Sequence, residues 1–226
     1  MKTDVVLLPG LHGSTALYDA FVALAPPWAR CVPVPLPTLG SQSLDGLATT
    51  LEAELKRLEG FVLVAESYSG PIAVRLAARL GQKVSLLALC NPLVEMPVAL
   101  PAGLAASAAS WRGMPATAAA MVLADGDRAL GQAALDGIRA LPKEVLEARL
   151  RAAFAATAEE IAPLLAPPVL AILGSRDRLV SPERTKALLE GVPFASVAEL
   201  DAPHLVVQTK PAEVWDAISD EFESAA

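Results

Sequence analysis

The sequence is poor in cysteine and histidine, the residues that build disulfide frameworks and most transition-metal sites. Its 226 residues include two cysteines, Cys31 and Cys90, and two histidines. Each cysteine lies in an apolar stretch, and the chain has neither a Cys-x-x-Cys motif nor a cluster of histidine and cysteine. We therefore expect two buried thiols, no disulfide framework and no structural zinc site.

The sequence also lacks clusters of basic residues and long uninterrupted apolar segments. It has 18 lysines and arginines against 25 aspartates and glutamates, which gives a formal net charge of −7. Such an acidic chain is a poor partner for nucleic acid or for an anionic membrane. The first apolar run, 5–8, is only four residues long, and prolines, glycines and an arginine interrupt the alanine-rich stretch at 98–124. We expect a cytoplasmic protein with no signal peptide and no membrane insertion.

Apolar residues are abundant, and they occur in short runs that alternate with helical patterns. Hydrophobic residues make up 54% of the chain and charged residues 19%, a composition that excludes intrinsic disorder. The central runs are continuous, as in strands that are covered on both faces. Three prolines, at 33, 35 and 37, favour an edge position for the second strand. The six expected strands cover residues 5–8, 31–36, 61–65, 84–90, 169–173 and 196–200.

Helical patterns separate these runs. Ser43 is placed to cap a helix over 44–58, in which leucines recur at i, i+4, i+8 and i+11. A second helix is expected over 70–80, ended by Gly81, a third after Ser181, and a fourth at the C-terminal end of the sequence. The repeated strand–helix–strand order predicts an α/β fold, with a mostly parallel sheet of about six strands and helices on both faces.

Residues 95–163 do not fit this alternation. They show no convincing strand pattern, are rich in alanine, and are too long for a simple crossover between two strands. We predict a helical lid inserted at 95–163, with 1–94 and 164–226 forming the core of the fold. Trp111 and Met121 are among its few large apolar side chains, and we expect them to line the substrate site. Because so few large side chains hold this segment, we also expect a mobile cover.

A candidate nucleophile lies where the third expected strand meets the following helix. Ser67 is at the centre of a sharp strand–turn–helix sequence, with the small residues Ala65 and Ser69 two positions before and after it. This arrangement resembles Gly-x-Ser-x-Gly, in which a strained turn exposes a serine at the carboxyl edge of a parallel sheet. Ser69 is the alternative nucleophile, but it would place Pro71 where a small residue is needed. The structural alternative for Ser67 is a helix N-cap.

A serine hydroxyl needs a base, and only two histidines can supply it. His204 follows the last expected strand, at the sheet edge where Ser67 is expected, whereas His12 follows the first strand. We therefore predict that His204 is the base. An acid must then orient the imidazole, and Asp177 follows the strand at 169–173, at the same edge.

The alternatives to Asp177 fit this geometry less well. Its structural alternative is a solvated turn aspartate, because an arginine stands on each side of it. Glu95 follows the preceding strand, and Asp201 is only three residues before His204, too near along the chain to reach round the ring easily. Three further aspartates fall within the predicted lid: Asp125, Asp127 and Asp136.

The order of Ser67, Asp177 and His204 along the chain, each after a strand end, resembles the α/β-hydrolase superfamily. The resemblance covers 4–94 and 166–226 and leaves out the predicted lid. It implies a reduced form of that fold, because no room remains for the two antiparallel strands that often precede the oxyanion-loop strand.

The segment after the first strand, Pro9-Gly10-Leu11-His12-Gly13-Ser14, looks like the oxyanion loop of this superfamily. If Pro9-Gly10 takes the place of the family's His-Gly pair, the resemblance implies Leu11 as an N–H donor. If His12-Gly13 does so, it implies Ser14. The second implied donor is Tyr68, the residue after the nucleophile, and His12 is expected beside the substrate.

The resemblance implies a serine hydrolase that cleaves a carboxylic ester or thioester through an acyl-enzyme, with no metal and no cofactor. The apolar, small-residue composition of the lid favours a small or medium apolar acyl group, so the expected partner is a small-molecule substrate. The alternatives are an acyltransferase, a perhydrolase or a lyase on the same fold, or a catalytically inactive ligand-binding protein. The sequence makes no prediction of an oligomeric state.

Overall fold

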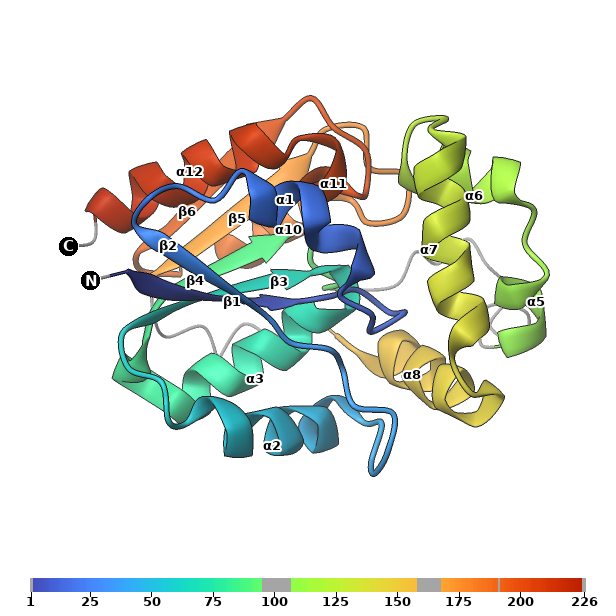
Figure 1. Cartoon of the computed structure of the whole chain (residues 1–226), viewed down its shortest axis with the longest axis horizontal. Helices are drawn as coiled ribbons and strands as arrows, with labels where there is room; N and C mark the ends of the chain where they lie inside the picture. Colours follow the sequence, from blue (N-terminus) through green and yellow to red (C-terminus); the bar gives the residue numbers. More distant parts are fainter. Residues whose placement is uncertain (1, 95–106, 158–167, 191, 225–226) are drawn as a thin grey trace.

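A six-stranded parallel sheet forms the centre of the protein (Figure 1). The computed structural model describes residues 2–94, 107–157, 168–190 and 192–224. The strand order is β2-β1-β3-β4-β5-β6, and each pair of neighbours is parallel, which confirms the predicted fold class. The strands are β1 (Thr3–Leu8), β2 (Ala29–Pro33), β3 (Phe61–Glu66), β4 (Val84–Cys90), β5 (Val169–Gly174) and β6 (Ala195–Leu200).

Helices cover both faces of this sheet (Figure 1). In β3, Leu63 and Ala65 belong to a core cluster on one face, and Val62 and Val64 belong to a cluster on the other. Because burying a valine or leucine is worth roughly 1.5–3 kcal/mol, a strand covered on both faces is apolar at every position. One face carries α2 (Leu44–Leu55), α3 (Gly70–Leu80) and α10 (Pro182–Leu189), and the other α1 (Asp19–Ala23), α11 (Val206–Thr209) and α12 (Pro211–Ser224).

The predicted helix caps are confirmed at both serines. Ser43 Oγ accepts a hydrogen bond from the N–H of Gly46 at 3.0 Å, and Ser181 Oγ accepts one from the N–H of Arg184 at 3.4 Å. Gly81 has a φ of +57° at the end of α3, a value that favours glycine. Short 3-10 helices complete the connections: η1 (Ala16–Tyr18), η2 (Ser67–Ser69) and η3 (Gly81–Lys83).

Two predicted boundaries were wrong. The second strand, predicted at 31–36, is β2 at 29–33, although its edge position is confirmed. Beyond Pro33 the chain leaves the sheet: the N–H of Leu36 donates to the carbonyl of Gly13 at 3.0 Å, so the chain crosses the loop that follows β1. The helix predicted over 44–58 ends at 55, where a tighter turn begins.

In the part of the chain that the structure describes, four helices lie between β4 and β5. They are α5 (Ala108–Arg112), α6 (Ala116–Leu123), α7 (Arg128–Ala140) and α8 (Lys143–Ala155), and we call them the helical insertion. Figure 1 shows them in green and yellow, beyond the carboxyl ends of the strands. The predicted limits of the insertion, at 95 and 163, lie outside the described residues. No described helix is long and apolar enough to cross a membrane.

Two glycines in α7 serve close packing. A Cβ on Gly131 would lie 2.6 Å from the main chain of Ala120, so this glycine lets α7 approach α6. A Cβ on Gly137 would lie 3.0 Å from the Cβ of His12, on the loop after β1. Both glycines therefore allow close contact, and α7 runs through them from 128 to 140 as one helix.

Candidate active site

Ser67 occupies a strained turn at the carboxyl end of β3. Its φ is +51°, a value that few residues other than glycine adopt, and it is the first residue of η2, directly after a fully buried strand. Its carbonyl oxygen accepts a hydrogen bond from the N–H of Leu93 at 2.9 Å. A Cβ on Gly70 would lie 2.7 Å from the Cβ of Pro92, so the start of α3 also packs tightly against the segment after β4. The turn therefore holds the hydroxyl at the edge of the sheet.

His204 lies within hydrogen-bond distance of Ser67. Its Nε2 is 2.9 Å from Ser67 Oγ, and its Nδ1 is 2.7 Å from Asp177 Oδ2. Only 2% of the histidine is exposed. Burial disfavours the charged imidazole, but the charge of Asp177 and its hydrogen bond outweigh burial and raise the pKa of His204 above 6.5. Three side chains from separate strand ends are thus arranged in one line.

The remaining carboxylate oxygen of Asp177 is held by the main chain. Oδ1 accepts hydrogen bonds from the N–H groups of Leu179, at 2.7 Å, and Val180, at 3.0 Å. The side chain of Asp177 is 1% exposed, so it is not a solvated turn aspartate. The two flanking arginines, Arg176 and Arg178, form ion pairs with other aspartates. The carboxylate therefore faces the imidazole with a fixed orientation.

The structure places the alternative residues elsewhere. Ser69 is fully buried, and its hydroxyl donates to the carbonyl of Pro9. Asp201 is at the surface, paired with Arg176, and Glu95 lies outside the described residues. Of the aspartates in the insertion, Asp127 caps α7 through the N–H of Leu130, Asp136 accepts from Gln132, and Asp125 pairs with Arg176 and Arg178.

The loop after β1, residues 10–14, runs beside the serine, and we call it the oxyanion loop. A Cβ on Gly10 would lie 3.7 Å from the Cβ of Ser67. The N–H of Gly13 donates to the carbonyl of Gly10 at 2.9 Å and closes a turn around Leu11. The N–H of Ser14 donates to His12 Nδ1 at 3.1 Å, so this candidate donor has a partner within the loop.

The sequence matches a known family over nearly its whole length. The matching family is described as the alpha/beta hydrolase family, and the match spans residues 5–217. The chain belongs to the alpha/beta hydrolase family. No curated protein matches it at a significant level.

Solved structures of similar fold include several alpha/beta hydrolases. An enol-lactonase from Burkholderia xenovorans has a TM-score of 0.84 and 20% identity, covering 99% of this chain and 92% of that one. An esterase from Thermogutta terrifontis has a TM-score of 0.82 and 19% identity, covering 100% and 91%. A bromoperoxidase from Bacillus anthracis has a TM-score of 0.84 and 17% identity, covering 99% and 92%. At these identities the likeness shows a shared fold.

Sequence reasoning missed Asn91, which joins the loop that carries His204 to the end of the strand that precedes Asp177. It follows β4 directly, with a φ of +41° that asparagine tolerates better than most residues. Its amide bonds to the carbonyls of Pro203 and His204 and to the N–H of Gly174. The signal in the sequence was a buried strand ending in a polar residue, at the same edge as the other site residues.

Glu66, directly before Ser67, was also missed. It is 2% exposed and is the last residue of a strand whose other members are apolar. Its Oε2 accepts a hydrogen bond from Gln208 Nε2 at 3.1 Å. Burial raises the pKa of this carboxyl, although Gln208, His204 and Tyr18 partly oppose the shift. An ionisable group is therefore buried near enough to His204 that its negative charge would help to raise the pKa of the imidazole.

The residues expected to line the substrate site differ in exposure. Trp111 is half-buried and packs on an apolar cluster of the insertion that Leu11 also contacts. Met121 is 49% exposed, and its carbonyl accepts a hydrogen bond from Arg178 at 3.1 Å. His12 is 9% exposed, and burial and the charge of Arg149 lower its pKa to about 4, so it is neutral at pH 7. Among the described residues no group of three histidine, cysteine, aspartate or glutamate side chains is arranged to hold a metal ion.

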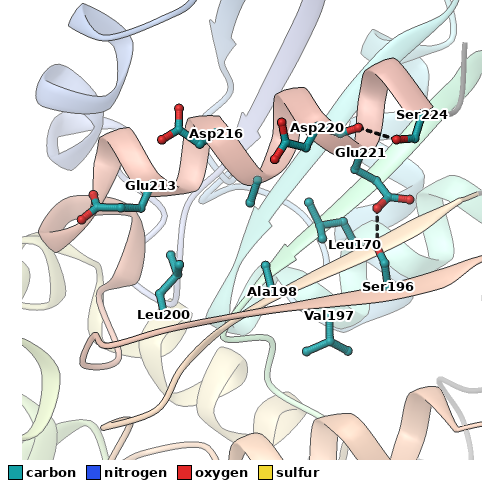
Figure 2. Close-up of a pocket in the computed structure, with 11 residues that line it drawn as sticks. Leu170, Ser196, Val197, Ala198, Leu200, Glu213, Asp216, Asp220, Glu221 and Ser224 are labelled. Atoms are coloured by element: carbon teal, nitrogen blue, oxygen red, sulfur yellow. Dashed lines mark hydrogen bonds between the residues drawn. The ribbon is translucent and has the colours of Figure 1, made fainter.

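A groove of about 430 Å³ lies between β6 and α12, outside this site (Figure 2). Four acidic residues are among those that line it: Glu213, Asp216, Asp220 and Glu221. Glu221 accepts a hydrogen bond from Ser196 at 2.6 Å. Ser67, Asp177 and His204 are not among the residues that line this groove, so it is separate from the candidate site.

Proposed function

We propose that this protein is a serine hydrolase that cleaves a carboxylic ester or thioester through an acyl-enzyme. One observation supports the proposal above all: Ser67 Oγ, His204 Nε2, His204 Nδ1 and Asp177 Oδ2 are linked by contacts of 2.9 and 2.7 Å at the carboxyl edge of the sheet. This is the arrangement in which a base activates a serine and an acid orients the base.

The contacts support a proposed role for each group. Ser67 Oγ attacks the acyl carbon while its proton passes to His204 Nε2. The imidazolium that forms is stabilised by Asp177, and its proton then passes to the departing alcohol or thiol. Water repeats the sequence on the acyl-enzyme: it gives a proton to His204, attacks the acyl carbon, and releases the carboxylic acid as Ser67 regains its proton.

The oxyanion of each tetrahedral intermediate needs N–H donors. The N–H groups of Leu11 and Tyr68 are the proposed donors, because the oxyanion loop runs beside Ser67 and Tyr68 follows it directly. Ser14 is the weaker candidate, since its N–H already bonds to His12. One donor of this kind is worth about 10²–10³ in kcat in serine hydrolysis.

The proposed substrate is a small molecule with a small or medium apolar acyl group. The helical insertion supports this choice, because it lies beyond the strand ends and its buried cluster, against which Leu11 packs, consists of aliphatic and alanine side chains. Trp111 and Met121 remain proposed lining residues. We propose that the reaction takes place in the cytoplasm and needs no nucleic acid or membrane.

Labelling with a fluorophosphonate probe tests the proposal. Wild type should become covalently modified at Ser67, and Ser67→Ala should fold and remain unlabelled. Ser69→Ala is the matched control, because Ser69 lies two residues away with its hydroxyl turned to Pro9. Loss of labelling in Ser69→Ala alone would contradict the assignment. A panel of p-nitrophenyl esters from acetate to palmitate then gives the acyl preference, and added alcohols distinguish hydrolysis from acyl transfer.

A further inference from the structure

Arg149 is a buried cation that belongs to the helical insertion and reaches the core. It lies on α8 and is 0% exposed, although the other buried residues of this helix are apolar. Burying a cation costs several kcal/mol unless its donors are satisfied. The position of Arg149 therefore requires a set of acceptors that compensates for this cost.

Each nitrogen of the guanidinium has an acceptor. Nε donates to Gln42 Oε1 at 3.0 Å, and Nη1 donates to the carbonyl of Leu11 at 2.9 Å. Nη2 donates to the carbonyls of Leu36, at 3.3 Å, and Pro37, at 3.0 Å. All of these acceptors are neutral, and three of them are main-chain groups. Arg149 thus fixes the course of two loops.

Through these contacts Arg149 is connected to Leu11 and Tyr68, the two residues whose N–H groups are the proposed oxyanion donors. Leu11 bonds to the guanidinium directly through its carbonyl. Gln42 accepts from Arg149 with its side chain, and its main-chain carbonyl accepts a long hydrogen bond of 3.4 Å from the hydroxyl of Tyr68. A single side chain of the insertion therefore touches one side of the proposed oxyanion hole and reaches the other through Gln42.

The oxyanion loop fits closely on this guanidinium. Gly13 has a φ of +71°, and a Cβ built on it would lie 2.4 Å from Arg149 Nη1. Its carbonyl accepts from the N–H of Leu36 at 3.0 Å, so the loop is bonded to the same segment that Arg149 holds. Only glycine fits such an approach, and the loop has no room to shift toward α8.

The charge of Arg149 also acts on this loop. Burial lowers the pKa of the guanidinium, yet arginine stays protonated in proteins. Together with burial, its charge lowers the pKa of His12 and so keeps this loop histidine neutral. A fixed positive charge beside this loop favours a developing oxyanion over the uncharged ester.

We propose that Arg149 is a positioning residue for oxyanion stabilisation, which holds the oxyanion loop at Leu11 and, through Gln42, the residue after the nucleophile. The inference rests on the proposed serine hydrolase function. Arg149 is fully buried, and all three nitrogens are occupied by protein acceptors, so it is not a binding group for a substrate carboxylate. An aliphatic side chain would pack α8 onto the core equally well, but it would leave the loop carbonyls without donors.

Two substitutions and a control on the same helix test the role. Arg149→Met keeps the length of the side chain and removes every donor, whereas Arg149→Lys keeps the charge and loses the planar fork. Arg151→Met is the control, because Arg151 is exposed on α8 two residues away. The measurements are kcat and KM for p-nitrophenyl butyrate, and the inhibition constant of a trifluoromethyl ketone with the same acyl chain, which forms an oxyanion on Ser67.

The proposal expects loss of transition-state binding without loss of substrate binding. Arg149→Met should lower kcat by about 10²-fold with KM within about threefold, and the inhibition constant should rise in proportion. Arg149→Lys should lose about tenfold in kcat, and Arg151→Met should match wild type. A purely structural role would change the amount of folded enzyme and leave the inhibition constant of that enzyme unchanged.

Three outcomes would overturn the inference. They are a folded Arg149→Met with wild-type kcat and inhibition constant, a rise in KM alone, or equal losses in Arg151→Met. If circular dichroism shows that Arg149→Met is unfolded, Arg149→Lys decides by the same criteria. If fluorophosphonates do not label wild type, the proposed hydrolase function itself is wrong. If wild type is labelled but the Arg149 variants keep its kcat and inhibition constant, only the role of Arg149 is wrong.

Discussion

The carbonyl oxygen of His204 accepts a hydrogen bond from Asn91 Nδ2 at 2.8 Å. The same side chain accepts from the N–H of Gly174 at 2.7 Å with its Oδ1, at the end of the strand that precedes Asp177. A Cβ on Gly174 would lie 2.5 Å from the carbonyl of Ala202, so the two loops are in direct contact there. Asn91 therefore holds together the main-chain segments that carry the proposed base, His204, and the proposed acid, Asp177.

Asn91→Ala should weaken both the fold and the activity. The substitution takes away the Asn91 partner of the buried N–H of Gly174 and of the carbonyl of Pro203, whereas the carbonyl of His204 keeps the N–H of Val206. This loss should lower the free energy of unfolding by about 2–4 kcal/mol. Urea denaturation measures this loss, and kcat should fall in the folded enzyme because the imidazole is less well placed. Ser85→Ala, also on β4 but half-buried at its opposite end, is the control. Wild-type stability and kcat in Asn91→Ala would refute the role.

The pH dependence should reflect the pair of His204 and Asp177. The proposed base works only when neutral, so kcat/KM should rise as the pH passes upward through the pKa of His204, which lies above 6.5 in the folded protein. In Asp177→Asn the cause of that shift is removed, so the acidic limb should move to lower pH. By analogy with serine proteases, kcat should also fall by about 10⁴-fold. An acidic limb at the same pH in both proteins would contradict this assignment.

Glu66 should make the protein less stable as the pH rises. Its pKa is raised from 4.5 in the folded state by burial, so folding favours the protonated carboxyl. The stabilisation is complete below the pKa of the unfolded chain and is lost as the pH rises toward the folded pKa. Glu66→Gln should therefore lose less stability than wild type between pH 4.5 and pH 8, as measured by urea denaturation.

Two further results would bear on this prediction. Glu223→Gln, which removes an exposed carboxyl from α12, should follow the wild-type pH dependence. Glu66→Gln should also move the acidic limb of kcat/KM to lower pH, because the carboxylate helps to raise the pKa of His204. Parallel stability curves for wild type and Glu66→Gln would show that Glu66 ionises as it does in the unfolded chain.

Local patterns were enough to predict the sheet and the residues at its edge. Buried strands have short apolar runs, and in a parallel sheet their carboxyl ends meet, so Ser67, Asp177 and His204 were identified from position and chemistry. β2 was misplaced because two of the three prolines, Pro35 and Pro37, belong to the segment after the strand. In that segment Val34 still donates to the carbonyl of Leu7, which extends the strand-like pattern beyond Pro33.

Arg149 was not predictable from such patterns. It is 138 residues from Leu11 and 107 residues from Gln42 along the chain, and its acceptors are mostly main-chain carbonyls, which carry no sequence signature. In α8 it looks like one of several charged residues on an exposed helix face. Only the tertiary packing of the insertion brings the guanidinium to the oxyanion loop.

The helical insertion is held at a second point, to the loops that carry Asp177 and His204. In the turn between α6 and α7, Asp125 pairs with Arg176 at 3.0 Å and with Arg178 at 3.5 Å, on both sides of Asp177. The N–H of Leu205 donates to the carbonyl of Leu123 at 2.9 Å, which links the residue after His204 to α6. If the insertion opened as a cover, it would have to break these contacts. From the sequence we expected only weak packing of this segment against the core.

Asp125→Asn should loosen this attachment without unfolding the protein. Asparagine tolerates the φ of +54° at this position, so the substitution removes the two ion pairs and keeps the turn. Exposed pairs contribute about 0–1 kcal/mol, so global stability should change little, while hydrogen exchange at the amide of Leu205 should accelerate. Because salt screens such pairs, wild type in 1 M salt should approach the variant, with Asp136→Asn on the exposed face of α7 as the control. Equal protection of Leu205 in wild type and Asp125→Asn would mean that the ion pairs do not hold the insertion at this point, and that the hydrogen bonds to the carbonyls of Met121 and Leu123 do so without them.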